Sequence, residues 1–182
     1  MWGHKSPLTG GYGDSEVGGY WGAEIKHAGY DAVIIEGKAA EPVYVWINDS
    51  RVEIRKAAHL WGQTTGRSQE MIREELQDQL IRTALIGPAG ENLVRYSCIL
   101  NDLSHAAGRT GLGAVMGSKK LKALAVRSRN RPVLANPDGV KALNGWLLEN
   151  MHLIKGRDQE RGAPTLGKLQ ELGIEWVAEH IA

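Results

Sequence analysis

Residues 108–126 read GRTGLGAVMGSKKLKALAV, and this stretch decides the fold. Its glycines surround an apolar run at helical spacing, which predicts a short helix over 112–119 introduced by glycine-rich turns. The apolar run 121–126 that follows predicts a buried strand. A glycine cluster, a short helix and a buried strand therefore form one structural unit.

The same order occurs earlier in the chain. A shift of 91 positions places Gly22 on Gly113 and Ile25 on Met116. The apolar run 32–35, expected to be a buried strand, then falls on 123–126. This similarity predicts an internal pseudo-twofold repeat, although two common units can also match by chance. In a true repeat, two helix N-termini would face one ligand, and their free N–H groups would suit phosphate or another anion.

A hairpin and two further strands are also expected. Residues 42–47 and 51–55 alternate in polarity around a short polar turn, which predicts a hairpin. Further strands are expected over 83–86 and 93–100, the second of which contains Cys98 as a small apolar side chain. The chain is thus expected to contain several short strands in mixed sheets.

A second short helix is expected over 18–28. Helical spacing also predicts three longer helices. The first covers 67–79 and is capped by Thr64 or Thr65, and two more cover 137–154 and 165–181. The fold class expected is therefore α+β, with mixed β-sheets, short helices and an internal pseudo-twofold repeat, followed by C-terminal helices. The chain is expected to divide near residue 130.

Composition excludes several classes of function. The 182 residues carry a formal net charge of +1, far from the basic balance of a nucleic-acid-binding domain. One cysteine, Cys98, permits neither an internal disulfide nor a zinc or iron–sulfur site built from this chain's thiolates. No apolar run approaches the roughly 20 residues that span a bilayer. We expect a cytoplasmic protein without nucleic-acid or membrane partners.

The glycine clusters do not match the common nucleotide-binding motifs. After Gly111 and Gly113, a dinucleotide-binding motif would require glycine where Met116 stands. A P-loop would require one more residue before Gly117 and lysine ahead of serine. A nicotinamide-binding module is therefore a remote alternative. The histidines form no close ligand pair, and His105 alone lies in the second glycine cluster.

Five segments of the chain resemble the N-terminal domain of the aldehyde ferredoxin oxidoreductase family. They are KSPLTG (5–10), GGYWGAEIK (18–26), GYDAVIIEG (29–37), IGPAGEN (86–92) and AAGRTGLGAVMGSK (106–119). The resemblance identifies residues 1–130 as part of a pterin-cofactor-binding N-terminal domain. Residues 131–182 resemble, less specifically, a linker and the first helices of a truncated helical domain.

The resemblance implies a bis-pterin cofactor that holds tungsten or molybdenum. It implies oxidation of aldehydes to carboxylic acids, with electrons passed to a [4Fe–4S] cluster and then to ferredoxin. The family's cluster-binding cysteines would follow residue 182, so this chain would not ligate the cluster. A family arginine and the first strands of the domain would precede Met1. The chain alone is therefore expected to be inactive.

The resemblance also assigns site residues. In the family, a magnesium ion bridges the pterin phosphates through main-chain carbonyls at positions that match Glu16 and Ala106. Main-chain oxygen suits Mg²⁺ whatever the side chain. The full cofactor-binding set is Glu16, Gly18, Gly19, His105, Ala106, Gly108 and Arg109. His105 stands where the family often has arginine, so its pairing with phosphate would weaken as pH rises.

A second function class remains open. The chain could be a non-catalytic scaffold or accessory subunit that keeps the fold and pairs with another chain. A domain without its first strands would expose sheet edge and apolar surface, which natural proteins cover. We therefore expect self-association or a partner chain.

Overall fold

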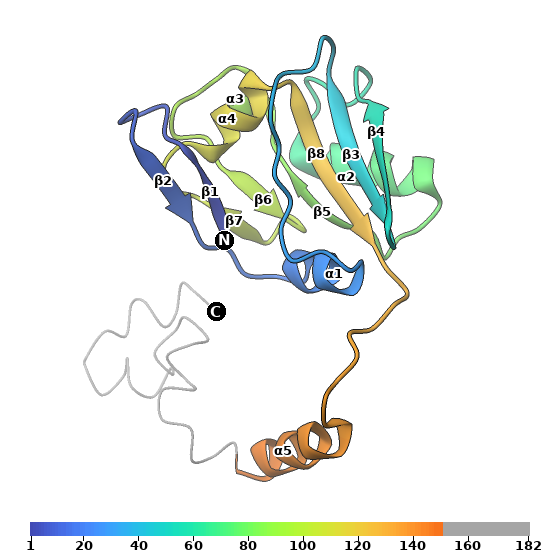
Figure 1. The fold of residues 1–182 in the computed structure, drawn as a ribbon. Helices are drawn as coiled ribbons and strands as arrows, with labels where there is room; N and C mark the ends of the chain where they lie inside the picture. Colours follow the sequence, from blue (N-terminus) through green and yellow to red (C-terminus); the bar gives the residue numbers. More distant parts are fainter. Residues whose placement is uncertain (151–182) are drawn as a thin grey trace, which may run out of the picture. The chain divides into compact units, whose positions relative to one another are not determined.

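The structure, a computed structural model, describes residues 1–150 (Figure 1). The chain divides into two units, Met1–Pro132 and Val133–Ala182. The second unit contributes one described helix, α5 (Pro137–Glu149), which Asn136 caps by accepting from the Gly139 N–H at 2.9 Å. The expected helix over 165–181 and the end of the one over 137–154 lie outside the described residues.

A six-stranded mixed sheet forms the centre of the first unit. Its spatial order is β4 (Arg51–Lys56), β3 (Val43–Asn48), β8 (Leu121–Arg127), β5 (Arg82–Leu85), β6 (Ile99–Asn101) and β7 (His105–Ala107). Strands β3 and β8 are parallel, and the other neighbouring pairs are antiparallel. Mixed and antiparallel sheets with short helices confirm the α+β class.

Helices cover the two faces of this sheet (Figure 1). One core contains α1 (Trp21–His27) and α4 (Leu112–Ser118) with Leu124 and Val126 of β8. The other contains α2 (Thr65–Leu76) with Ala123 and Ala125 of the same strand. Because β8 is apolar on both faces apart from Lys122, it can lie buried in the middle of the sheet.

A second, two-stranded sheet pairs β1 (Trp2–Lys5) with β2 (Tyr12–Ser15). The Trp2 ring packs 5.1 Å from the Trp21 ring of α1, and the Trp21 indole N–H donates to the Leu124 carbonyl at 3.1 Å. The N-terminal strands are thereby connected to the central sheet. The sequence patterns did not predict these two strands, because apart from one aromatic residue in each their residues are polar or glycine and carry no apolar alternation.

One charged pair is buried in the first unit. Lys122 of β8 bonds the carboxylate of Glu91 at the end of α3 (Pro88–Glu91) and donates to the Gln63 carbonyl at 2.9 Å. The other Glu91 oxygen accepts from the Gly62 N–H at 2.7 Å. Burial lowers the pKa of Lys122, an effect that the Glu91 carboxylate opposes. The pair holds α3 and the chain around Gly62 against β8.

Most predicted elements are confirmed, and two strands are not. The hairpin, the helix capped by Thr64 and the central strand β8 are present. The prediction of a buried strand over 32–35 is wrong: Ile34 is 84% exposed and the segment pairs with no described strand. Ile35 instead packs against the core that contains α1 and α4, and with Val33 it lines a hollow beside β1, so the apolar side chains of this segment serve packing without backbone pairing.

The predicted strand over 93–100 is also largely wrong, because β6 begins at Ile99. Local hydrogen bonds occupy the backbone before it: the Val94 N–H donates to Ala89 and the Ser97 N–H to Val94, both at 2.9 Å. Cys98 therefore lies just before β6, half-buried. The two repeat copies share a short helix at matched positions, and only the second continues into a strand.

Candidate cofactor-binding site

Two segments that are far apart in sequence meet beside the sheet. We call residues 14–19 the first loop and residues 101–111, which include β7, the second loop. The Arg109 N–H donates to the Ser15 hydroxyl and the Thr110 hydroxyl to the Asp14 carbonyl, both at 3.4 Å. The Asn101 side-chain amide donates to the Gly18 carbonyl at 3.2 Å. The two glycine-containing loops therefore form one continuous surface.

Strand β1 and the residue that follows it hold the second loop by hydrogen bonds. The His4 ring nitrogen Nε2 donates to the Thr110 carbonyl at 2.8 Å, and the Ser6 hydroxyl donates to the same oxygen at 3.2 Å. Thr110 has a φ of +64°, a conformation that a β-branched residue rarely adopts. These two hydrogen bonds hold the carbonyl of this unusual residue in place.

The His105 ring packs against the glycines of the first loop. A Cβ added to Gly18 would lie 3.0 Å from the ring carbon Cδ2, and one added to Gly19 would lie 3.2 Å from Nδ1. Gly19 also has a φ of +92°, which favours glycine. The Ser104 hydroxyl lies 3.1 Å from Nδ1. Because these two glycines have no side chains, the His105 imidazole can pack directly against their backbone.

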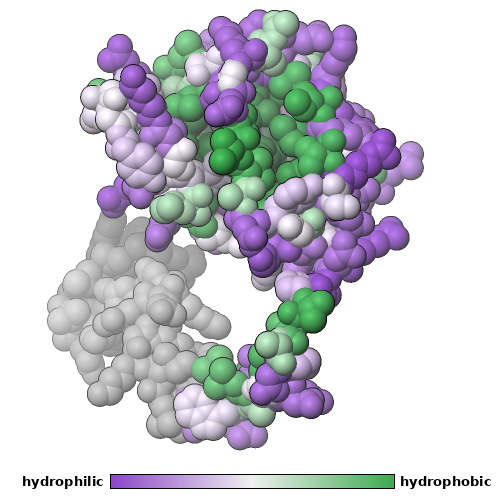
Figure 2. All heavy atoms as spheres, in the orientation of Figure 1, coloured by the Kyte–Doolittle hydropathy of each residue, from purple (hydrophilic) through white to green (hydrophobic). Residues whose placement is uncertain are grey.

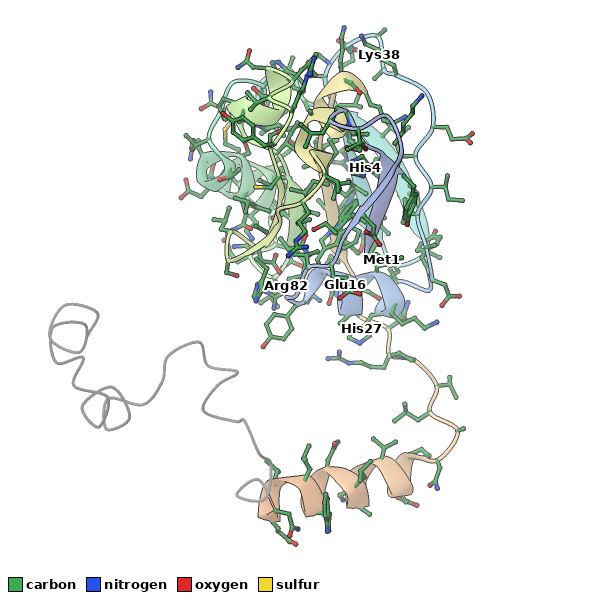
Figure 3. The ribbon with its side chains drawn as sticks, turned by 90° about the vertical axis from the view of Figure 1, so that its left-hand side faces the viewer. Met1, His4, Glu16, His27, Lys38 and Arg82 are labelled. Atoms are coloured by element: carbon green, nitrogen blue, oxygen red, sulfur yellow. The ribbon has the colours of Figure 1, made fainter. Side chains whose placement is uncertain are left out.

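The structure brings all seven predicted site residues to these two loops, and all seven are exposed: Glu16, Gly18, Gly19, His105, Ala106, Gly108 and Arg109. An open pocket of about 450 Å³ is lined by Met1, Glu16, Val17 and Gly18. Figure 3 places Met1, Glu16 and Arg82 at one end of the first unit and Lys38 at the other. The roles of the seven residues stay predictions.

Unsatisfied polar atoms gather at the same loops. Among the described residues, four buried side-chain atoms lack a hydrogen-bond partner, and three belong to His4, Asn101 and Asp102. Leaving a buried donor or acceptor unpaired costs about 1–3 kcal/mol. Buried polar atoms without a partner beside exposed residues such as Glu16 and Ala106 are typical of a ligand site, where main-chain oxygen suits Mg²⁺ and backbone N–H groups suit phosphate. The residues present therefore fit a phosphate-bearing ligand with a hard cation.

Sequence reasoning missed the side chains that flank the loops. The Arg82 guanidinium lies 4.7 Å over the Tyr20 ring and 3.8 Å from the Asp102 carboxylate. No sequence motif connects these residues, because β5 and β6 bring Arg82 and Asp102 together only in the folded sheet. They add one cation and one anion next to the first loop.

Most glycines of the second cluster serve close packing. A Cβ on Gly111 would lie 2.1 Å from the Arg95 carbonyl oxygen, and one on Gly117 would lie 2.0 Å from that of Gly90. A Cβ on Gly113 would lie 2.7 Å from the Cys98 carbonyl oxygen. Gly108, in contrast, has open space around it. Of this cluster, Gly108 is the one free to face a ligand.

Among residues 1–150, no helix has the length and apolarity needed to cross a membrane. In the same part of the chain, no three His, Cys, Asp or Glu side chains gather as metal ligands.

The fold places two glycine-containing loops in contact beside a mixed sheet. Residues 1–128 match the family model described as the aldehyde ferredoxin oxidoreductase N-terminal domain. The chain belongs to this family.

Curated relatives extend the match. The tungsten-containing aldehyde ferredoxin oxidoreductase of Pyrococcus furiosus is 53% identical over 130 residues, 71% of this chain and 22% of the relative. That of Thermococcus kodakarensis is 51% identical over 132 residues, 72% of this chain and 22% of the relative. The aliphatic sulfonate oxidoreductase, WOR-like subunit, of P. furiosus is 40% identical over 132 residues, covering 66% and 21%. The chain spans about a fifth of these relatives.

A solved structure shares the fold. It is the active site complex BamBC of benzoyl coenzyme A reductase in complex with 1,5-dienoyl-CoA. The similarity has a TM-score of 0.79 and 39% sequence identity, and it covers 85% of this chain and 24% of that chain. The described fold is thus found in an oxidoreductase assembly of more than one kind of chain.

Proposed function

We propose that this chain is the cofactor-cradling part of a tungsten or molybdenum bis-pterin oxidoreductase. The observation that carries the proposal is the direct contact between the first and second loops, whose glycine clusters lie about 90 residues apart in sequence. Two loops on opposite sides of the first unit would have contradicted the proposal. Tungsten-containing relatives support the metal.

The protein's share of the work is binding and orientation. The main-chain carbonyls of Glu16 and Ala106 would supply oxygen ligands to Mg²⁺, which would offset the charge of the cofactor's phosphate groups. Gly18, Gly19 and Gly108 would leave the backbone close enough for its N–H groups to reach phosphate oxygens. Arg109 would neutralise phosphate charge. Together these groups would fix the cofactor on the face of the first unit.

When bound, the cofactor would oxidise an aldehyde to a carboxylic acid, with electrons passing to a [4Fe–4S] cluster that this chain does not ligate and then to ferredoxin. His105 would lie at the edge of the cradle, where Gly18, Gly19 and the Ser104 hydroxyl restrict its ring.

Elemental analysis tests the proposal. The full chain is purified, with any chain that co-purifies, from a host that makes the cofactor and is supplied with tungstate. We expect stoichiometric tungsten or molybdenum with phosphorus in a fixed ratio to the metal. Protein without either element would contradict the proposal and favour a non-catalytic scaffold or accessory subunit. Fluorescence titration with nicotinamide cofactors should show no binding.

A second test concerns His105. The variant His105→Arg supplies a permanent charge and should not reduce metal and pterin content per chain. The control is His59→Arg, because His59 is exposed and contacts Glu75, away from both loops. A marked loss of cofactor in His105→Arg, with none in the control, would refute the assignment of this position.

An apolar area of the first unit supports a partner chain or a second copy. Figure 2 shows hydrophobic residues gathered on one face of this unit. A hollow of about 340 Å³ there is lined by Trp2, Val33, Ile35 and residues of α4, and Ile34 beside it is exposed. Light scattering should show self-association or a complex, whereas a stable monodisperse monomer would count against this expectation.

A further inference from the structure

We propose that Asn101 is a positioning residue that fixes the first loop on the second and thereby sets the spacing of the two magnesium-binding carbonyls. This inference rests on the proposed function, which supplies the carbonyls of Glu16 and Ala106. Asn101 lies outside the set of residues assigned to cofactor binding. Its role follows from what its backbone and side chain contact.

The backbone of Asn101 is held on both sides. In the sheet it is paired with Ala84 of β5 and with His105 of β7. Its carbonyl also accepts from the Ser104 N–H at 3.2 Å. Because His105 directly precedes Ala106, Asn101 and the second carbonyl belong to the same short hairpin.

The side chain of Asn101 reaches the first loop. It is 2% exposed, and its amide nitrogen donates to the Gly18 carbonyl at 3.2 Å. A Cβ on Gly19 would lie 3.8 Å from the Asn101 Cβ. Glu16 lies two residues before Gly18. The Asn101 amide therefore holds the loop that contains the Glu16 carbonyl against the hairpin that contains the Ala106 carbonyl.

The chemistry fixes the orientation of the amide. The Gly18 oxygen can only accept, so the NH₂ group must face it, and Oδ1 is left buried without a partner. A buried unpaired acceptor is costly, so a residue that served packing alone would be apolar. An asparagine here is explained by the donor it presents to the loop.

The expected effect of an Asn101 variant follows from the coordination geometry of Mg²⁺. Mg²⁺ requires near-ideal octahedral geometry with oxygen at about 2.0–2.1 Å, and it tolerates little displacement of its ligands. Outer groups that orient metal ligands typically change metal affinity by about 10–100-fold when mutated. Loss of the Asn101 amide should therefore weaken cofactor retention much more than it lowers stability.

The test compares Asn101→Ala and Asn101→Asp with Asn92→Ala and Asn92→Asp in the full chain. Asn92 is a matched control, because its amide donates to the Pro88 carbonyl at 2.9 Å at an exposed position outside the site. Tungsten and phosphorus contents are measured after dialysis at several Mg²⁺ concentrations, together with the melting temperature of cofactor-free protein.

Both Asn101 variants should retain about 10-fold less cofactor at low Mg²⁺ and recover at high Mg²⁺, while the Asn92 variants match the unmodified chain. Asn101→Asp replaces the donor by an oxygen that repels the Gly18 carbonyl, so it should fail like alanine. Wild-type content in Asn101→Asp would overturn the inference and indicate a direct cation ligand. Wild-type content in Asn101→Ala would show that the residue has no such role. Where alanine prevents folding, the aspartate variant carries the test.

Amide hydrogen exchange separates the inference from the proposed function. In cofactor-free protein, residues 14–19 should exchange faster in the Asn101 variants than in the unmodified chain and the Asn92 controls. Unchanged exchange would overturn the positioning role, whatever the cofactor content. Unmodified chain that is empty of metal and phosphorus would instead contradict the proposed function, and hydrogen exchange would still decide whether Asn101 positions the loop.

Discussion

The two glycine clusters contain matched positions that serve opposite purposes. Gly22 of α1 corresponds to Gly113 of α4 in the internal similarity. A side chain on Gly22 would meet no atom within 4 Å, whereas one on Gly113 would lie 2.7 Å from the Cys98 carbonyl oxygen. In the second cluster, glycine lets backbones pack directly. Glycine at Gly18 and Gly19 instead leaves room for the His105 ring at an exposed surface.

This difference separates stability from binding. Mutations among the packed glycines and the buried pair behind them should unfold the first unit, whereas changes in the first cluster should leave the fold intact. Three substitutions, Gly117→Ala, Lys122→Met and Gly22→Ala, test the separation, and a fourth, Asp49→Asn, serves as a reference.

The largest effect is expected for Gly117→Ala. Its Cβ would lie 2.0 Å from the Gly90 carbonyl oxygen, so α3 and α4 must separate. We expect a loss of about 4 kcal/mol or more in the free energy of unfolding, measured by urea denaturation. A midpoint equal to that of the unmodified chain would show that the two helices are not in direct backbone contact.

Lys122→Met should cost about 3 kcal/mol, because it leaves the buried Glu91 carboxylate without its cation. The double variant with Glu91→Gln should recover part of this loss, since the amide oxygen can still accept from Gly62. Lys56→Met is the control: its exposed pair with Glu41 is worth about 0–1 kcal/mol. Equal losses of unfolding free energy in Lys122→Met and Lys56→Met would show that the Lys122–Glu91 pair is not buried.

Gly22→Ala should stabilise the first unit by about 0.5–1 kcal/mol. The position is helical and open, and alanine reduces the entropy of the unfolded chain. Thermal melting measures the gain. A destabilisation would mean that the first cluster is packed like the second and would remove the distinction between them.

The smallest effect concerns a reference site outside both clusters. The Ser128 hydroxyl, followed by the Arg129 N–H, holds the pKa of Asp49 below its ordinary value of 3.8. The folded state thus binds this proton less tightly than the unfolded state. The stabilisation is present above pH 3.8 and is lost as the pH falls through the lower folded pKa. The stability difference between the unmodified chain and Asp49→Asn should therefore shrink only in acid, as thermal melts will show.

Local patterns predicted the elements whose own residues determine them. The hairpin, the Thr64 cap and β8 follow from alternation, capping chemistry and apolarity, and each is confirmed. The segment 32–35 carries the same strand signal as β8 and forms no strand, because a strand also depends on a neighbouring strand that pairs with it in the folded chain. Sequence period cannot report that neighbour.

The candidate site was predictable only in part. The resemblance named Glu16, His105 and Ala106, and the structure places these residues on loops in contact. Asn101 carried no signal, because its function depends on the distance between β6 and the Gly18 carbonyl in the folded chain. The packing role of Gly117 likewise depends on α3, which approaches it only in three dimensions.

The strand order has a consequence for synthesis on the ribosome. Strand β8 is the last of the sheet to be made, and it lies between β3 and β5, which are made earlier and share no hydrogen bonds with each other. Until residue 127 has been made, no strand can join β4 and β3 to β5, β6 and β7, and the edges of β3 and β5 that β8 will cover have no partner. These unpaired edges are the surfaces that a chaperone would bind. The second loop is also made before the strand that closes the sheet.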